Sequence, residues 1–149
     1  MHKVLIASDH AGFKGKEFIK TTLDSMKIPY EDLGTTSEDS VDYPDYAEKV
    51  ALGVAGGAAD RGVLVCGSGI GMSIAANKVP GIRAALAWNE ETARLSREHN
   101  DANIVAVGAR TTPFETIDTI IRTFMTTEFS DGRHQQRIRK IAQIEKNDQ

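Results

Sequence analysis

The chain has 149 residues, which fits a single domain (1–149) with a hydrophobic core of ordinary size. Hydrophobic residues make up 40% of the chain, charged residues 26%, and the net charge is −3, so there is no global basic field that would indicate nucleic acid as a partner. The apolar run near the N-terminus is too short for a secretory signal, and no uncharged stretch is long enough to span a bilayer. We therefore expect a cytoplasmic protein with no membrane partner.

Cysteine and histidine, the usual ligands of structural metals, are sparse in this sequence. The only cysteine, Cys66, excludes an intramolecular disulfide and is consistent with a reducing compartment. The four histidines, at positions 2, 10, 99 and 134, lack the spacings of metal motifs. We expect no metal site.

The first half of the chain alternates short apolar runs with longer amphipathic segments. In chain order the expected elements are a strand at 3–8, a helix at 13–26, a more polar strand at 28–34, a helix within 41–57 and an almost wholly apolar strand at 62–67.

The second half repeats this alternation and ends in a helix. The expected elements are a helix at 71–78, a strand at 82–88, a helix capped by Asn89 and running to Glu98, a strand at 103–108, a helix opened by a capping box at 112–115 with Pro113 in its first position, and a last helix within 130–149. Five alternations predict an α/β fold, a Rossmann-like open sheet of five parallel strands with helices on both faces.

The last helix differs from the others because no strand follows it. Its apolar residues, Ile138, Ile141 and Ile144, form only a narrow stripe, and its other faces are charged. We expect this helix to pack on a second subunit.

Cys66 and the glycine-rich loop behind it lie where the third strand passes into a helix. Ligands bind beyond the carboxyl ends of the strands of an open parallel sheet. Gly67, Gly69 and Gly71 let the backbone turn its N–H groups toward one anionic oxygen, so the loop is an anion or oxyanion cradle, or else a turn needed only for tight packing. A dinucleotide fingerprint fits poorly, because Met72 stands where its third glycine belongs.

Taken alone, Cys66 has two interpretations. A thiolate is stabilised near a helix N-terminus, so Cys66 can serve as a base or nucleophile. A single cysteine is also often one more small buried hydrophobic residue. Polar residues near other strand and helix ends favour the first interpretation: these are Ser8, Asp9, His10, His99, Asn100 and Arg110, with Arg133 and Arg137 one turn apart on the last helix. This set suits proton transfer on a small phosphorylated substrate.

Six segments together resemble the ribose-5-phosphate isomerase B family, which is grouped with the galactose-6-phosphate isomerase subunits. They are SDHAGF (8–13), DYPDYA (42–47), CGSGIGMSIAANK (66–78), GIRAAL (81–86), LSREHNDANI (95–104) and DGRHQQR (131–137). The resemblance covers nearly the whole chain. It is to the branch with a cysteine base, since 73–75 carry no carboxylate.

The resemblance implies a homodimer, or a tetramer built from it, with active sites at the interface and no metal or cofactor. It also implies roles for single residues. Cys66 would move a proton between C1 and C2 of the sugar, and His99 would open the ring as an acid with Asp9 beside it. Gly67, Ser68, Gly69, Ile70 and Gly71 would line the enediolate cradle, Ser68 taking the role of a threonine found in many relatives. His10, Arg133 and Arg137 would bind phosphate, and Tyr43, Asn100 and Arg110 would complete the pocket.

The implied reaction is the interconversion of D-ribose 5-phosphate and D-ribulose 5-phosphate in the pentose phosphate pathway. Two alternatives stay open at this point. One is an isomerase of six-carbon aldose 6-phosphates such as allose or galactose 6-phosphate, because the sequence does not settle the depth of the pocket. The other is a non-catalytic module that binds sugar phosphates.

Overall fold

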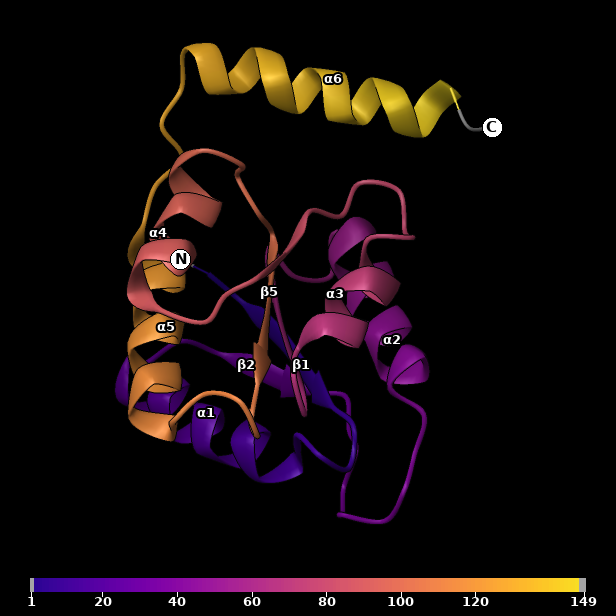
Figure 1. Ribbon diagram of the computed structural model, residues 1–149, viewed down its shortest axis with the longest axis vertical. Coiled ribbons are helices and arrows are strands. Elements are labelled where there is room, and N and C mark those ends of the chain that lie inside the picture. Colours follow the sequence, from indigo (N-terminus) through magenta and orange to yellow (C-terminus); the bar gives the residue numbers. More distant parts are fainter. Residues whose placement is uncertain (1, 148–149) are drawn as a thin grey trace.

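A sheet of five parallel strands in the order β2-β1-β3-β5-β4 forms the centre of the molecule (Figure 1). The computed structural model describes residues 2–147. The strands are β1 (Val4–Ser8), β2 (Tyr30–Asp32), β3 (Arg61–Cys66), β4 (Ala84–Leu86) and β5 (Ile104–Gly108). The parallel α/β fold expected from the alternating sequence pattern is confirmed.

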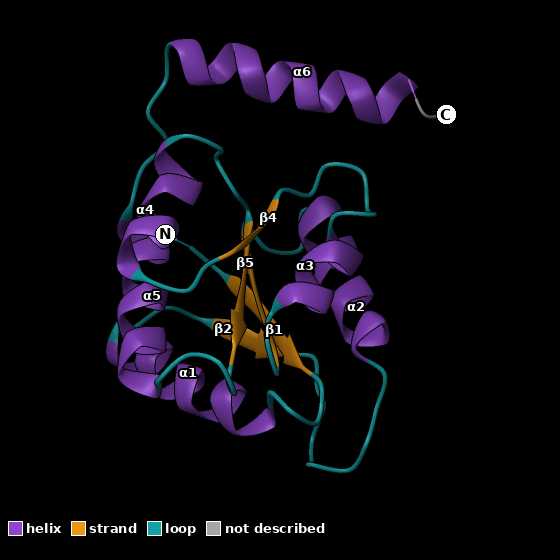
Figure 2. Cartoon of the chain, in the orientation of Figure 1, coloured by secondary structure: helices purple, strands orange, loops and turns teal. Residues whose placement is uncertain are grey.

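Helices cover both faces of this sheet (Figure 2). One face carries α1 (Phe13–Ser25), α4 (Glu90–Glu98) and α5 (Phe114–Thr126), and the other carries α2 (Tyr43–Ala55) and α3 (Ile70–Ala76). Successive residues of a strand point to opposite faces, so β1 sends Val4 and Ile6 into one core and Leu5 and Ala7 into the other. Full burial of each large aliphatic side chain stabilises the fold by about 1.5–3 kcal/mol.

The connection that follows β1 leads to one side of the sheet, where β2 lies, and the later strands are added on the other side, beginning with β3. β1 pairs with β2 on one side and with β3 on the other, and Ser8 lies opposite Val65 in the register of the second pair. A crevice opens beyond the carboxyl ends of the strands at such a switch point, because the connections on either side leave in opposite directions. The residues that follow β1 and β3 therefore meet there.

Two helix starts test the expectations about capping. Asn89 caps α4 as predicted: its Oδ1 accepts a hydrogen bond from the Thr92 N–H at 2.8 Å. The capping box predicted at 112–115 is wrong, because Pro113 itself takes the N-cap position of α5. Its carbonyl accepts the N–H groups of Thr116 and Ile117, and no side chain caps this helix. Strands β2 and β4 are also shorter than expected.

The last helix, α6 (Arg133–Asn147), lies apart from the sheet layers (Figure 1). Ile141 and Ile144 are 40% and 62% exposed, so the apolar stripe is only partly covered by its own chain. Residues 148–149 of the predicted helix lie outside the described residues. Between residues 2 and 147, the helices are all too short or too polar to pass through a bilayer.

Candidate active site

A cavity of about 650 Å³ opens at the switch point between β1 and β3. It brings together nine of the residues singled out in the sequence. Its lining consists of Asp9, His10, Ala11, Tyr43, Cys66, Gly67, Ser68, Ile70, Gly71, Ile74, Arg110 and Thr111.

Cys66 lies at the base of this cavity and is only 5% exposed. The loop after it folds back over the sulfur, and the Gly69 N–H donates a hydrogen bond to Cys66 Sγ at 3.1 Å. Gly69 has a φ of 80°, a left-handed conformation that glycine adopts without a steric cost. A side chain at Gly69 would also collide with the Val107 backbone, at 2.9 Å from an added Cβ. Glycine at this position therefore keeps the loop against the thiol.

Ser68 supports the start of α3 from within the same loop. Its Oγ accepts a hydrogen bond from the Ile70 N–H at 3.2 Å. The hydroxyl proton can still be donated toward the cavity, since this bond uses only a lone pair of the oxygen. The N–H groups of Gly69 and Ile70 thus both have acceptors within the loop, and these bonds hold its shape.

Asp9 and His10 follow β1 and line the same cavity as the thiol, from the other side of the switch point. The Asp9 carboxylate is buried, and its Oδ1 accepts the Gly12 N–H at 2.9 Å. His10 Nδ1 lies 3.1 Å from the backbone nitrogen of Val41 and 3.2 Å from its carbonyl oxygen. One ring nitrogen is therefore held by the segment that leads into α2, which leaves Nε2 for a ligand.

Tyr43 and Arg110 flank the cavity from two further elements. Tyr43 opens α2 and is 40% exposed, and Arg110 follows β5, where its N–H donates to the Gly67 carbonyl at 2.9 Å. An exposed guanidinium at the mouth of a cavity can pair with an anionic group of a ligand.

Three lining residues were missed by the sequence analysis: Ala11, Ile74 and Thr111. Ile74 lies one helical turn after Ile70, so the i, i+4 spacing on α3 placed both on one face. Thr111 directly follows Arg110. Ala11 directly follows His10 in the same way. In all three cases the available signal was proximity to a residue that had already been chosen.

His99 and Asn100 do not reach this cavity within one chain. They follow α4, and a helix that connects parallel strands runs back toward the edge where the strands begin. Ile104 starts β5 and Gly108, which pairs with Cys66, ends it, and these four steps span about 13 Å. Residues at helix ends and residues at strand ends were expected in one site, and the structure places them at opposite edges of the sheet.

The N-terminus of α6 lies beside His99. The rings of His99 and His134 are stacked, with centroids 4.2 Å apart, and the Ser130 N–H donates to the Glu98 carbonyl at 3.0 Å. Desolvation, and then Coulombic interactions with His99, Arg133 and Arg137, lower the pKa of His134. Arg133 and Arg137 share this helix, so one chain carries a cationic cluster far from its own Cys66.

A second groove of about 440 Å³ lies between α6 and the β4 edge of the sheet. Ile141 and Ile144 line it from the helix, and Asn100 and Arg83 line it from the amino edge.

Among residues 2–147, no three His, Cys, Asp or Glu side chains gather in a way that would hold a metal ion.

The switch point of this open parallel sheet holds a buried thiol, a carboxylate and an imidazole. An α/β protein with these groups in one cavity has a site suited to proton transfer on a small anionic molecule. Comparisons with known proteins narrow this class. Residues 4–141 match the model of the family described as Ribose/Galactose Isomerase. The chain belongs to that family, which confirms the resemblance seen in the sequence.

Individual relatives and solved structures agree with this assignment. The chain is 51% identical over 144 residues to a putative sugar phosphate isomerase of Bacillus subtilis, covering 96% of this chain and 97% of that one. It is 44% identical over 145 residues to ribose-5-phosphate isomerase B of Escherichia coli, covering 97% of each. The Clostridium thermocellum ribose-5-phosphate isomerase B structure superposes with a TM-score of 0.97 at 48% identity and 99% coverage of both chains. A Mycoplasma genitalium structure with bound ribulose-5-phosphate gives 0.93 at 40% identity, covering 97% of this chain and 96% of that one.

Proposed function

We propose that this chain is a single-domain isomerase that interconverts D-ribose 5-phosphate and D-ribulose 5-phosphate through a cis-enediolate, without a cofactor. The observation that carries the proposal is the Cys66 thiol at the base of the switch-point cavity, wrapped by its own glycine loop. The names of the relatives, and the ribulose-5-phosphate in one neighbouring structure, support the choice of substrate.

In the proposed reaction, His99 first donates a proton to the ring oxygen as the C1–O bond of the furanose breaks, and the C1 hydroxyl loses its proton to water as the aldehyde forms. The Cys66 thiolate then removes the proton from C2 of the aldose; the electron pair of that C–H bond forms the C1–C2 double bond, and the C1=O electron pair moves onto O1 to give the enediolate. The O2 proton passes to O1, the C2=O bond forms, and the C1–C2 double-bond pair takes the same carbon-bound proton back from sulfur at C1, which gives the ketose. Each hydrogen-bond donor that faces the developing oxyanion is worth about 3–4 kcal/mol of transition-state stabilisation.

The proposed site is complete only when two copies combine. One copy supplies the Cys66 cavity with Asp9 and His10, and the other supplies His99 and Asn100 with the phosphate-binding arginines of α6. The exposed apolar residues support a homodimer: Tyr43, Ile70 and Ile74 surround the cavity, and Ile141 and Ile144 line the face of α6. Apolar surface gathered in this way is typical of a protein interface.

Isomerisation assays with ribose 5-phosphate, allose 6-phosphate and galactose 6-phosphate in parallel test the substrate. We expect the highest kcat/KM with ribose 5-phosphate. A preference for a six-carbon sugar would replace the proposed substrate, and binding of all three without turnover would identify a non-catalytic binding module.

Mixed dimers test the shared site. The Cys66→Ala and His99→Ala variants are each expected to be inactive. When the two variants are unfolded and refolded together in equal amounts, half of the dimers that form contain one chain of each variant. One of the two sites in such a hybrid dimer has both Cys66 and His99, so about a quarter of the wild-type activity returns. A mixture as inactive as its components would show that the two residues do not combine across subunits.

A further inference from the structure

Asp101, the residue that follows His99 and Asn100, has an unusual backbone conformation. Its φ is 45°, in the left-handed region that a residue with a side chain adopts at a cost in energy. Such a conformation persists only where surrounding contacts impose it. The contacts at Asp101 therefore show what determines the path of the chain just after His99.

Arg97 holds Asp101 from within the protein. Its side chain is almost fully buried, and Nη1 donates to Asp101 Oδ1 at 2.8 Å and to the Ala102 carbonyl at 2.7 Å. Its Nε donates to the Thr127 carbonyl at 3.1 Å, just beyond the end of α5. Arg97 thus ties the turn after α4 to a neighbouring helix.

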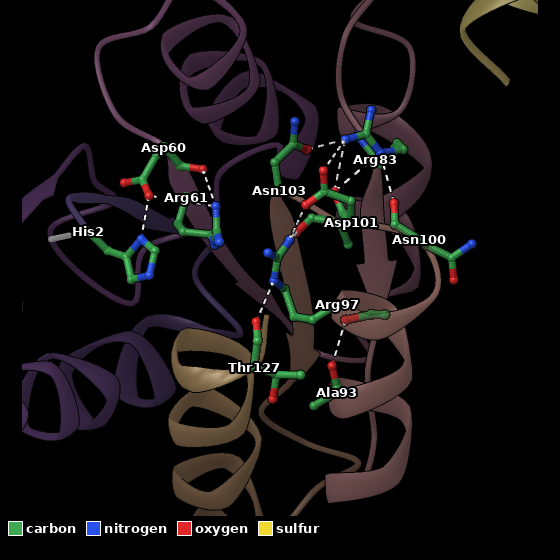
Figure 3. A network of polar contacts seen from close by, with 12 residues as sticks. His2, Asp60, Arg61, Arg83, Ala93, Arg97, Asn100, Asp101, Asn103 and Thr127 are labelled. Atoms are coloured by element: carbon green, nitrogen blue, oxygen red, sulfur yellow. Dashed lines mark hydrogen bonds and ion pairs between the residues drawn. The ribbon is translucent and has the colours of Figure 1, made fainter. Parts of the chain in front are cut away.

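Arg83 holds the same turn from the opposite side, at the start of β4 (Figure 3). Its Nε donates to the Asn100 carbonyl at 2.9 Å, and its Nη2 donates to the Asp101 carbonyl at 2.9 Å. A planar guanidinium can bind two successive carbonyls in this way, whereas the single ammonium of a lysine cannot match both. The backbone of Arg83 is itself fixed, because its N–H donates to Asn103 Oδ1 at 2.9 Å.

We propose that Arg83, Arg97 and Asp101 form a positioning network that sets the direction in which His99 and Asn100 leave the amino edge of the sheet toward the cavity of the second subunit. The proposal rests on the proposed function, since it is that function which places His99 and Asn100 in a shared site. Figure 3 shows the Asn100 amide pointing away from the network, while its carbonyl points into it. The network thus holds the backbone and uses neither side chain, and the His99 ring stacks on His134 instead.

The pattern of contacts separates positioning from simple stabilisation. Apolar residues often stabilise a fold as well as a buried ion pair does. The ionic contacts alone would therefore be weak evidence that these residues have a role in positioning. Here the donors converge on the carbonyls of three successive residues, Asn100 to Ala102, in a turn whose backbone is strained. A displacement of about 1 Å at a catalytic group can lower the rate up to 100-fold.

Kinetics with ribose 5-phosphate provide the first measurement. We expect Arg83→Gln to lower kcat by roughly 10- to 100-fold with little change in KM, because the cavity and the arginines of α6 are untouched. Arg83→Lys keeps the charge but only part of the hydrogen bonding, and should lie between Arg83→Gln and the wild type. Arg122→Gln is the matched control, since Arg122 forms an ion pair with Asp118 at 2.9 Å on α5 and lies outside the network. Its kcat should stay at the wild-type value.

Mixed dimers then show which half of the site is damaged. Arg83→Gln mixed with Cys66→Ala should recover about a quarter of the wild-type activity, because one hybrid site has both halves intact. Arg83→Gln mixed with His99→Ala should recover nothing beyond the residual activity of Arg83→Gln. A chain that is merely unstable would recover with neither partner.

Three results would overturn the proposal: wild-type kcat in Arg83→Gln, recovery in its mixture with His99→Ala, or failure of both Arg83 variants to recover with Cys66→Ala. Failure of the reference mixture, Cys66→Ala with His99→Ala, would reject the shared site itself and the positioning network with it. Success of that reference mixture, with failure of the Arg83 mixtures, would reject the network alone.

Discussion

The ring of Tyr43 lies directly over Gly71. A Cβ added at Gly71 would come within 2.6 Å of Tyr43 Cε1 and 2.7 Å of its Cζ, closer than such atoms approach in folded proteins. Gly71 lies in α3 and Tyr43 opens α2, so the missing side chain allows an aromatic residue from one helix to line the cavity beside another. The glycine at this position shapes the cavity as well as the loop.

Gly71→Ala should therefore damage substrate binding without damaging the fold. Alanine favours a helix by about 0.5–1 kcal/mol over glycine, so the melting temperature should not fall. The half-exposed Tyr43 ring must move, and we expect KM for ribose 5-phosphate to rise about 10-fold, equivalent to one 1.4 kcal/mol contact. The control is Gly71→Ala in a Tyr43→Ala background. There the added methyl has nothing to displace, and a further rise in KM would contradict the explanation.

Cys66→Ala should abolish turnover and leave substrate binding nearly intact. Loss of a general base typically lowers the rate by about 10²–10⁴. Cys66→Ser is the matched variant, because it preserves the shape and the contact with Gly69 but provides a hydroxyl that does not ionise near neutral pH. Steady-state kinetics combined with calorimetric binding of ribose 5-phosphate separate the two effects. Near-normal kcat in either variant would refute the role of Cys66 as the base.

Arg137→Ala should weaken the recognition of phosphate. A charge-assisted hydrogen bond contributes about 1.5–3 kcal/mol, so KM for ribose 5-phosphate should rise roughly 10- to 100-fold. Arg139→Ala, an exposed arginine of the same helix, is the control and should change KM little. The decisive comparison uses unphosphorylated ribose, on which wild type and Arg137→Ala should perform alike. An equal loss on both sugars would show that Arg137 does not contact the phosphate.

A buried ion pair between Lys16 and Asp32 predicts how stability depends on pH. Lys16 is 1% exposed, and its Nζ lies 2.5 Å from Asp32 Oδ2. Burial opposes ionisation of Asp32, but hydrogen bonds from Lys16, the Gly34 N–H and Lys20 outweigh it and lower the pKa of this carboxyl. Because the folded-state pKa is the lower one, the stabilisation is complete above about pH 4 and is lost as the pH falls through the folded-state pKa.

Asp32→Asn should accordingly lower the free energy of unfolding by roughly 1–3 kcal/mol at pH 7, since it leaves the buried Lys16 ammonium with Glu17, at 3.1 Å, as its one carboxylate partner within residues 2–147. Lys16→Met should cost less, because an apolar chain of similar length fills the buried space and Asp32 keeps its contact with Lys20 at 3.0 Å. Urea unfolding between pH 3 and pH 7 measures both. A difference between wild type and Asp32→Asn that stays constant down to pH 3 would contradict the assignment.

The sequence was sufficient to predict the order of strands and helices and the core of the site. The strands of a parallel sheet are buried on both faces and the helices on one, so apolar runs alternate with amphipathic segments. This alternation can be read directly from the sequence. Cys66 ends a strand, Asp9, His10 and Arg110 lie within two residues of a strand's end, and the carboxyl ends of parallel strands share one edge. Their convergence on one cavity followed from the topology alone.

Only the tertiary structure decided which groups cannot meet within one chain. His99 and Asn100 end a helix rather than a strand, and the antiparallel course of that helix carries them to the opposite edge, a distinction that spacing along the chain does not encode. The burial of Lys16, the left-handed turn at Asp101 and the contact of Tyr43 with Gly71 also escaped the sequence analysis. Each depends on atoms from segments far apart in the chain, and a local pattern of residue types carries no information about such contacts.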